Sequence, residues 1–312
     1  MISGKKWMLY IGIFMIIFFV SAYFSIPYII DGSSDEFYLR FTTPKQHSLI
    51  IGTSRAAQGI RPNVFNRSEN RLKYPIFNFA FTGNHSPMGE VYYNAVLKKF
   101  NRNTTDSVFI IEVNPRSLSM PLSADPSKPP ELSSFLADLQ FVNMNPNFEY
   151  LAERAKYKLY QYVEFKFRGN DRMLLHNDGW LEITIPMDQP EIQRRMEQKL
   201  SEYRKKFESE LEISDYRLSY LKKTIEYFSS YGSVYIVRMP VSEPMYELEK
   251  SYWNDFDNTV NQITAETGAE YINLIDYTGI VQTTDGHHLY KNDGLFISEQ
   301  ILQRINNNNG QQ

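Results

Sequence analysis

The segment SLIIGTSRAAQGIRP, residues 48–62, contains a short apolar run that ends in Gly52, Thr53 and Ser54. A run of this length, followed by a glycine and then by residues compatible with a helix, predicts a strand, a tight turn and a helix. A serine on such a turn is either a nucleophile exposed at the end of a strand or the N-cap residue of the helix that follows. The rest of the chain has to distinguish these two roles.

Four further segments share this short, apolar character and are bounded by polar residues or glycine, which makes five predicted strands. They are HSLIIG (47–52), PIFNFAF (75–81), SVFIIEVN (107–114), SVYIVRM (233–239) and AEYINLI (269–275). Nearly continuous apolar runs are typical of parallel strands that are covered on both faces. The pattern therefore predicts an α/β protein with a five-stranded parallel sheet.

Segments with helical periodicity separate the predicted strands, as a doubly wound sheet requires. We expect helices at about 87–100, across 191–227 with a break at Ser214, at 247–267 ending before Gly268, and at 293–305. Residues 116–190 are rich in proline and tyrosine and do not follow this rhythm. We interpret them as an α-rich insertion at one end of the sheet, in which Trp180 either stacks on sugar rings or belongs to a packed lid.

The first thirty residues have a different composition from the rest. Lys5 and Lys6 precede the apolar run Trp7–Phe24, whose 18 residues span roughly 27 Å as a helix. The basic residues before the run and Asp31 after it favour a cytoplasmic N-terminus. We therefore predict a membrane anchor at 1–30 and an extracytoplasmic domain at 31–312. A cleaved signal peptide is the alternative.

The overall composition excludes several other classes of protein. The chain has 312 residues, a net charge of −3 and no cysteine. The charge argues against nucleic-acid binding, and the lack of cysteine excludes disulfides, thiolate metal sites and a cysteine nucleophile.

Polar residues follow several of the predicted strands, and in an open α/β sheet ligands bind beyond the carboxyl ends of the strands. Ser54 follows the first strand, Gly83 the second and Asn114 ends the third, while Asp285 and His288 lie in a loop after the fifth. A serine needs a base such as histidine, which a carboxylate orients, and a tetrahedral oxyanion needs hydrogen-bond donors. We predict Ser54, His288 and Asp285 as catalytic residues. The Ser54 and Gly83 amides and the Asn114 side chain are the predicted oxyanion donors.

This order of residues resembles the SGNH, or GDSL-type, hydrolase superfamily. The matching blocks are IIGTSR with Ser54, NFAFTG with Gly83, IEVNP with Asn114, and DGHHL with Asp285 and His288. Two of them depart from the family pattern, since Thr53 replaces the usual aspartate and the third block is reduced to EVNP. The resemblance covers about 47–115 and 215–305. It implies a flavodoxin-like three-layer fold and serine-dependent acyl chemistry.

Several assignments remain open from the sequence. Asn114 is either an oxyanion donor or a turn residue before Pro115, and His287 competes with His288 as the base. Arg55, Arg116 and Arg238 stand at strand ends, where they either clamp an anionic substrate or face solvent. The two adjacent histidines with Asp285 make a poor metal site. No metal or other cofactor is expected.

The function expected from the resemblance is that of an esterase or O-acyltransferase of the cell envelope. Membrane-anchored members of the superfamily act in D-alanyl lipoteichoic acid synthesis and polysaccharide O-acetylation. The implied partners are a cell-surface glycan or teichoic-type polymer and a membrane-bound O-acyltransferase. The alternative is a catalytically silent module that presents a polymer to such an acyltransferase.

Overall fold

Five parallel strands form the central sheet of the computed structural model, which describes residues 4–67, 69, 72–154 and 157–309. The strand order is β2-β1-β3-β8-β9, and every neighbouring pair is parallel. This is the order of a flavodoxin-like sheet. The predicted fold class is confirmed, and each predicted strand overlaps one observed strand: β1 (Ser48–Ile51), β2 (Ile76–Asn78), β3 (Ser107–Glu112), β8 (Gly232–Arg238) and β9 (Glu270–Asn273).

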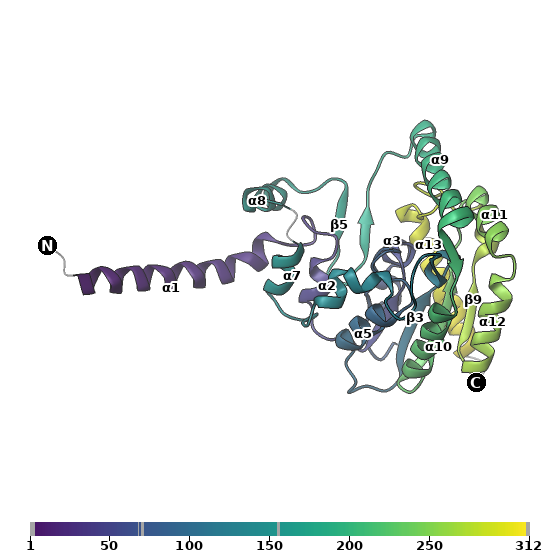
Figure 1. Ribbon diagram of the computed structural model, residues 1–312, viewed down its shortest axis with the longest axis horizontal. Helices are drawn as coiled ribbons and strands as arrows, with labels where there is room; N and C mark the ends of the chain where they lie inside the picture. The colour runs from purple at the N-terminus through teal and green to yellow at the C-terminus, as the bar shows by residue number, and fades with distance from the viewer. Residues whose placement is uncertain (1–3, 68, 70–71, 155–156, 310–312) are drawn as a thin grey trace.

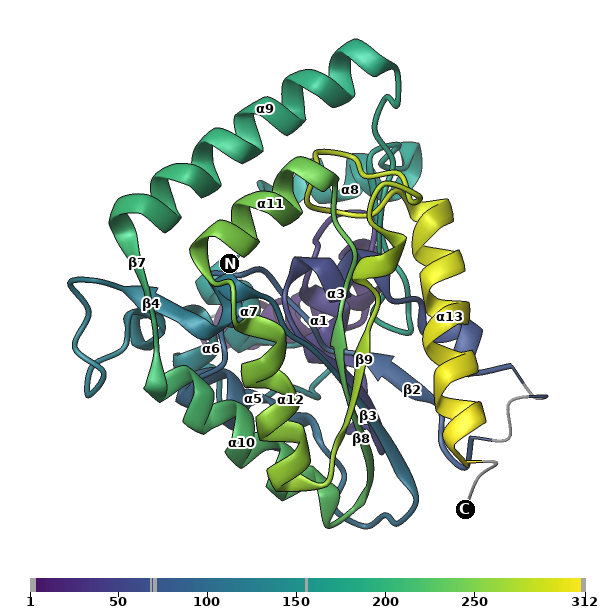
Figure 2. The ribbon, with the colours of Figure 1, turned by 90° about the vertical axis from the view of Figure 1, so that its right-hand side faces the viewer.

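Helices cover both faces of the sheet and make three layers, as Figure 2 shows with α13 (Lys291–Asn309) on one side and α10 (Asp215–Ser229) on the other. Successive residues of β1 divide between the two hydrophobic cores, with Leu49 and Ile51 in one and Ile50 in the other. This alternation explains why the strands are apolar at nearly every position. The first core packs on α5 (Glu90–Lys99), α10 (Asp215–Ser229) and α12 (Phe256–Thr267), and the second on α3 (Ser54–Gly59), α4 (Pro62–Phe65) and α13 (Lys291–Asn309).

The helix boundaries follow recognisable capping residues. Ser214 caps α10 by accepting a hydrogen bond from the Arg217 amide, as its position in the sequence predicts. Gly268 ends α12 in the left-handed conformation. The single helix predicted for 247–267 is wrong, because two helices occupy this region: α11 (Glu243–Tyr252) and α12. A break at Trp253 to Asp255 separates them.

The chain between β3 and α10 forms the insertion. It contains α6 (Phe135–Asp138), α7 (Phe148–Arg154), α8 (Leu159–Arg168) and α9 (Gln189–Lys205), three short η helices and two small antiparallel sheets. One of these sheets pairs β4 (Ser119–Pro121) with β7 (Leu211–Ile213). The insertion therefore extends to Ile213, beyond the expected end at 190. The short helices are the 3-10 helices η2 (Pro115–Leu118) and η3 (Pro130–Ser133) and the π-helix η4 (Lys206–Glu210). The other sheet pairs β5 (Met173–Leu175) with β6 (Leu181–Ile183).

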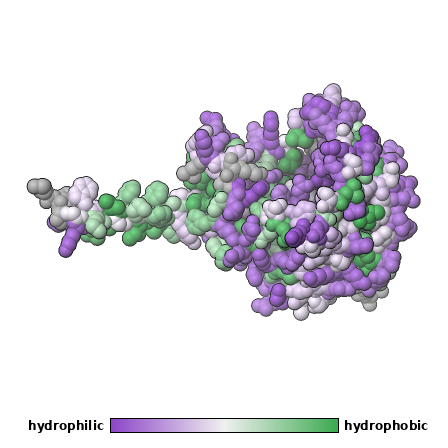
Figure 3. Space-filling view, in the orientation of Figure 1, coloured by the Kyte–Doolittle hydropathy of each residue, from purple (hydrophilic) through white to green (hydrophobic). Residues whose placement is uncertain are grey.

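Helix α1 (Gly4–Ile29) projects from the domain, and α2 (Tyr38–Thr42) follows it in the core (Figure 1). Apolar side chains surround α1 along most of its length, as Figure 3 shows. This helix of 26 residues is long and apolar enough to cross a membrane. The orientation of the span, and whether it is cleaved, stay predictions.

Candidate active site

Ser54, His288 and Asp285 form a continuous hydrogen-bonded relay at the carboxyl edge of the sheet. Ser54 Oγ lies 2.8 Å from His288 Nε2, and His288 Nδ1 lies 2.9 Å from Asp285 Oδ2. Since the carboxylate accepts the Nδ1 hydrogen, the Nε2 lone pair of a neutral imidazole faces the serine hydroxyl. The relay therefore has the geometry of a nucleophile, a base and an orienting acid.

The loop around Asp285 fixes the orientation of this carboxylate. Its Oδ1 atom accepts hydrogen bonds from the amides of His287, at 3.0 Å, and His288, at 2.9 Å. Burial raises the pKa of Asp285, but its electrostatic interaction with His288 and these hydrogen bonds outweigh that effect and hold the pKa well below its ordinary value. Asp285 therefore remains an anion at neutral pH.

The turn before Ser54 requires a glycine and gives the capping role to Thr53. Gly52 has φ +152°, and a Cβ at this position would lie 2.7 Å from the Cβ of Glu112. Thr53 is the N-cap residue of α3, because its side chain accepts a hydrogen bond from the amide of Arg55. The capping role considered for Ser54 is therefore wrong. Its hydroxyl is left to contact His288.

The Ser54 and Gly83 amides are available as oxyanion donors. Neither N–H has an acceptor in the part of the chain that the structure describes. Both residues line a narrow space of about 10 Å³, together with Thr53, Asn114 and Tyr203. Two amides beside the nucleophile suit a tetrahedral oxyanion.

Asn114 lies at the same space, but its side chain is fully engaged. Its Nδ2 donates to Glu112 Oε1 at 2.7 Å and to Thr53 Oγ1 at 3.3 Å, and its Oδ1 accepts from the Ser117 amide at 3.0 Å. Both amide hydrogens are therefore directed away from an oxyanion. The expected donor role would require Asn114 to release one of these acceptors.

Glu112 is a buried carboxylate that the sequence analysis did not single out. It accepts hydrogen bonds from the amide and the hydroxyl of Thr53, both at 2.8 Å, in addition to the bond from Asn114. It thereby joins the end of β3 to the turn that carries Ser54. An acidic residue inside the apolar run FIIEV was the available signal, since a charge in a buried strand needs partners.

Arg55 does not contact the cleft as expected. Its side chain is 2% exposed and forms an ion pair with Glu249, which is also fully buried. Arg238 is similarly buried and is bonded to Asp257. The expectation that Arg55 binds substrate is therefore wrong, because its guanidinium is held inside the domain.

His287 is excluded as the base by its partners. Its Nδ1 lies 3.3 Å from Arg55 Nε, and its Nε2 lies 3.2 Å from the hydroxyl of Tyr203. Burial and the charge of Arg55 lower the pKa of His287 well below its ordinary value, so the ring is neutral. Since Nδ1 accepts from Arg55, the ring hydrogen is on Nε2, and no lone pair remains for a substrate proton.

Arg116 reaches the surface and stands between two hollows. Its guanidinium contacts Asn84 Oδ1 at 2.8 Å and the Tyr203 hydroxyl at 3.2 Å. On one side is a cleft of about 280 Å³, bordered by Ser54, His288 and Lys199. On the other is a cavity of about 420 Å³, formed largely by the insertion.

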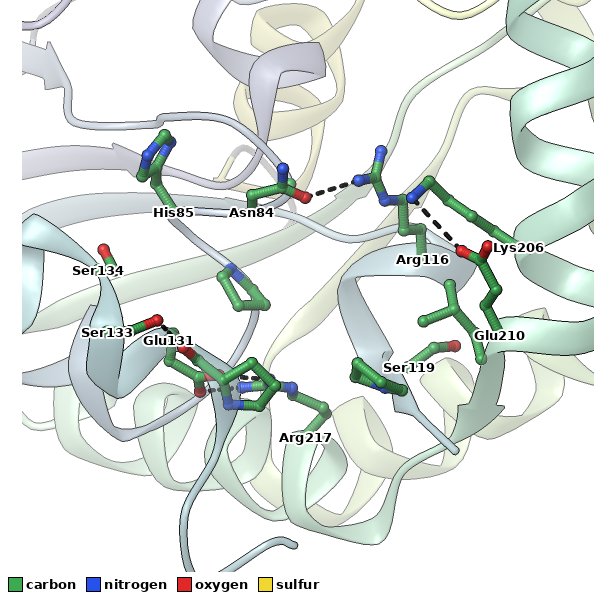
Figure 4. A pocket seen from close by; sticks show the side chains of 15 residues that line it. Asn84, His85, Arg116, Ser119, Glu131, Ser133, Ser134, Lys206, Glu210 and Arg217 are labelled. Atoms are coloured by element: carbon green, nitrogen blue, oxygen red, sulfur yellow. Dashed lines mark hydrogen bonds and ion pairs between the residues drawn. The ribbon is translucent and has the colours of Figure 1, made fainter. Parts of the chain in front are cut away.

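The larger cavity has charged walls whose charges are paired. Figure 4 shows Arg116 and Asn84 on one wall and Arg217 with Glu131 on another. Arg217 forms a bidentate ion pair with Glu131, and Lys206 lies 3.8 Å from Glu210. The cavity therefore presents both donors and acceptors without a large excess of either charge.

Trp180 is not available for stacking on sugars. It is buried, its indole donates to the Gln58 carbonyl at 2.8 Å, and Arg61 lies over its ring. Helix α9 from the same insertion instead borders the cleft through Lys199 and Glu202. Within residues 4–67, 69, 72–154 and 157–309, no group of three histidine, aspartate or glutamate side chains is placed to bind a metal ion.

Comparisons with known proteins identify no family. No protein-family description and no curated protein sequence matches the chain. Among solved structures, the chain is similar to a crystal structure of Est24, a carbohydrate acetylesterase from Sinorhizobium meliloti. The identity is 11%, the TM-score is 0.35, and the match covers 84% of this chain and 98% of Est24. A similarity this weak adds nothing about activity, so the function has to be inferred from the site itself.

Proposed function

We propose that the chain is a serine-dependent esterase or O-acyltransferase that acts on ester-linked acyl groups of a cell-envelope glycan. The observation that carries this proposal is the relay from Ser54 through His288 to Asp285. The order of blocks that resembles the SGNH superfamily agrees with it.

The first half of the reaction transfers the acyl group to the protein. Ser54 Oγ attacks the ester carbonyl carbon while its proton moves to His288 Nε2. The Ser54 and Gly83 amides donate to the oxyanion. When this intermediate collapses, the ester C–O bond breaks and His288 returns the proton to the departing sugar oxygen. The product is an acyl ester of Ser54, and the imidazole is neutral again.

The second half transfers the acyl group to an acceptor hydroxyl. His288 takes the proton of water or of a sugar hydroxyl, whose oxygen attacks the acyl carbon. Collapse releases Ser54, which recovers its proton from His288. Hydrolysis and transfer use the same intermediate and differ only in the acceptor. The cleft of about 280 Å³ that Ser54 and His288 border offers space for the acceptor next to the nucleophile, and the cavity of about 420 Å³ lies on the other side of Arg116.

The charge distribution of that cavity favours a hydroxylated glycan over a polyphosphate. Arg217 is bonded to Glu131, and Lys206 lies 3.8 Å from Glu210. Arg116, which also lines this cavity, lies 4.0 Å from Glu202, so each of these cations has a carboxylate nearby that competes with a phosphate. Neutral hydroxyl groups match a wall that offers both donors and acceptors.

A silent binding module is the second candidate, and the state of Asn114 favours it. With both amide hydrogens bonded to Glu112 and Thr53, the free oxyanion donors among the described residues of the site are the Ser54 and Gly83 amides. Such a module would present the polymer to a membrane-bound O-acyltransferase.

The test is acetate release by the full-length chain in detergent from an O-acetylated polysaccharide, with and without an unacetylated sugar acceptor. We expect release that is lost in Ser54→Ala and retained in Ser219→Ala, which changes an exposed serine of α10. Acetylated acceptor would identify transfer. No turnover of any ester by a folded wild-type chain would favour the binding module.

A further inference from the structure

We propose that one face of α8 lies in the headgroup region of the membrane that α1 crosses, so that the domain rests on the lipid surface. The face consists of Tyr160 and Phe167, which lie two helical turns apart. Their side chains are 62% and 73% exposed. The inference rests on the predicted membrane span and goes beyond the proposed chemistry.

The position of α8 follows from its contacts with the end of α1. Lys166 of α8 forms a 2.8 Å ion pair with Asp31, the first acidic residue after the apolar helix. The same ammonium lies 4.6 Å from the ring centroid of Tyr28 on α1. These contacts tie α8 to the point at which the chain leaves the span. Figure 1 shows α7 and α8 at the end of the domain from which α1 projects.

The length of α1 places that point at the depth of the lipid headgroups. Residues 7–24 fill roughly 27 Å of the hydrocarbon core, and six further residues add about 9 Å before Asp31. The polar zone of a bilayer begins at the edge of the hydrocarbon and extends over a similar distance. Lys166 and its helix therefore lie at the membrane surface when the span is in place.

The composition of the α8 face suits this depth. Aromatic side chains favour the membrane–water interface. Lys166 is paired with Asp31, and Arg168 with Glu164 at 2.6 Å, so these charges balance and the aromatic side chains carry the proposed contact with lipid. Phe148 of α7 extends the aromatic surface, since it is half exposed and its ring centroid lies 6.1 Å from that of Tyr23 on α1.

The absence of cysteine from the chain allows a direct test with single labels. The full-length protein is reconstituted into phosphatidylcholine–phosphatidylglycerol vesicles with nitrobenzoxadiazole at Phe167→Cys. Ile16→Cys in the middle of α1 and Lys250→Cys on α11 are the matched controls. Nitroxide-labelled lipids then quench whichever labels contact lipid.

The expected result is a blue-shifted label at position 167 that a headgroup-proximal nitroxide quenches, a deeply quenched label at 16 and an unquenched label at 250. Quenching at 16 without quenching at 167 would overturn the proposal for α8. A blue shift at 167 without quenching would also overturn the proposal, because protein and not lipid would then cover this face. Absence of quenching at 16 would show that α1 does not cross the membrane, and the proposal would then have no basis. None of these outcomes bears on the chemistry of Ser54.

Discussion

Glu112 Oε1 accepts a 2.7 Å hydrogen bond from the side-chain amide of Asn114, two positions further along the chain. Its other oxygen accepts from the amide and hydroxyl of Thr53. One buried carboxylate thus fixes both the turn before the nucleophile and the residue expected to donate to an oxyanion. The geometry of the site depends on this contact as much as on the relay itself.

Replacing Glu112 with glutamine tests this role. The new NH₂ group cannot accept hydrogen bonds. In either orientation of the glutamine, it would therefore face donors, either the amide and hydroxyl of Thr53 or the side-chain amide of Asn114. We expect Glu112→Gln to lower the free energy of unfolding by about 1–3 kcal/mol, the usual cost of a buried donor without an acceptor. Urea unfolding followed by circular dichroism measures the change. Glu226→Gln, at an exposed site on α10, is the control. Equal losses in both variants would contradict a structural role for Glu112.

Asp285→Asn tests the orientation of His288. Without a carboxylate on Nδ1, the imidazole is no longer held with its Nε2 lone pair toward Ser54. We expect kcat for p-nitrophenyl acetate to fall by about 10²–10⁴-fold with little change in KM. Asp276→Asn changes an exposed aspartate and should retain full activity. A variant Asp285→Asn that is as active as wild type would exclude Asp285 from the relay.

The pH dependence of stability should report the buried neutral state of His287. Its pKa is lowered well below the ordinary value of 6.5 in the folded protein. Below pH 6.5 the unfolded chain therefore binds a proton that the folded chain does not, and stability falls as the pH falls. The contribution is at most about 1.4 kcal/mol per pH unit.

His287→Gln removes this titration while keeping an acceptor for Arg55 and a donor for Tyr203. Urea unfolding at intervals between pH 7 and 5 should give a shallower decline for the variant than for wild type. Parallel curves would show that His287 gains a proton in the folded state and would contradict the assigned neutral ring.

Arg55 and Arg116 both follow a strand, but we expect replacement of Arg55 to lower stability and replacement of Arg116 to weaken substrate binding. Arg55→Met leaves the buried Glu249 with Arg238 at 3.6 Å, and we expect a loss of about 3–5 kcal/mol in stability. Arg116→Gln removes a side chain at the edge of the cleft and should cost about 1 kcal/mol or less. Its expected effect is a higher KM for glycan esters. A raised KM in a fully stable Arg55→Met variant would restore Arg55 as a substrate contact.

The sequence predicts the sheet and the relay because both depend on local patterns. Each strand is a short apolar run, and parallel strands bring the residues that follow them to one edge. Ser54 and His288 are 234 positions apart, yet their places after the first and fifth strands suffice to bring them together.

Side-chain directions were not predictable in the same way. Arg55 turns inward because Glu249, 194 positions away, lies behind it, and no local pattern signals that partner. The bonds of Asn114 to Glu112 and Thr53 likewise exist only when two neighbouring strands are assembled. The sequence does not signal the break between α11 and α12, because the apolar residues Tyr252, Phe256 and Val260 keep the four-residue spacing of a continuous helix across it.

Covalent labelling of Ser54 is the most direct test of the central claim. The full-length chain is treated with a fluorophosphonate at neutral pH, and its intact mass is measured. A single adduct that maps to Ser54, and that is absent in Ser54→Ala and His288→Ala but present in Ser219→Ala, is the predicted result. A folded wild-type chain that gains no adduct, or one whose adduct survives in Ser54→Ala, would contradict a nucleophilic Ser54.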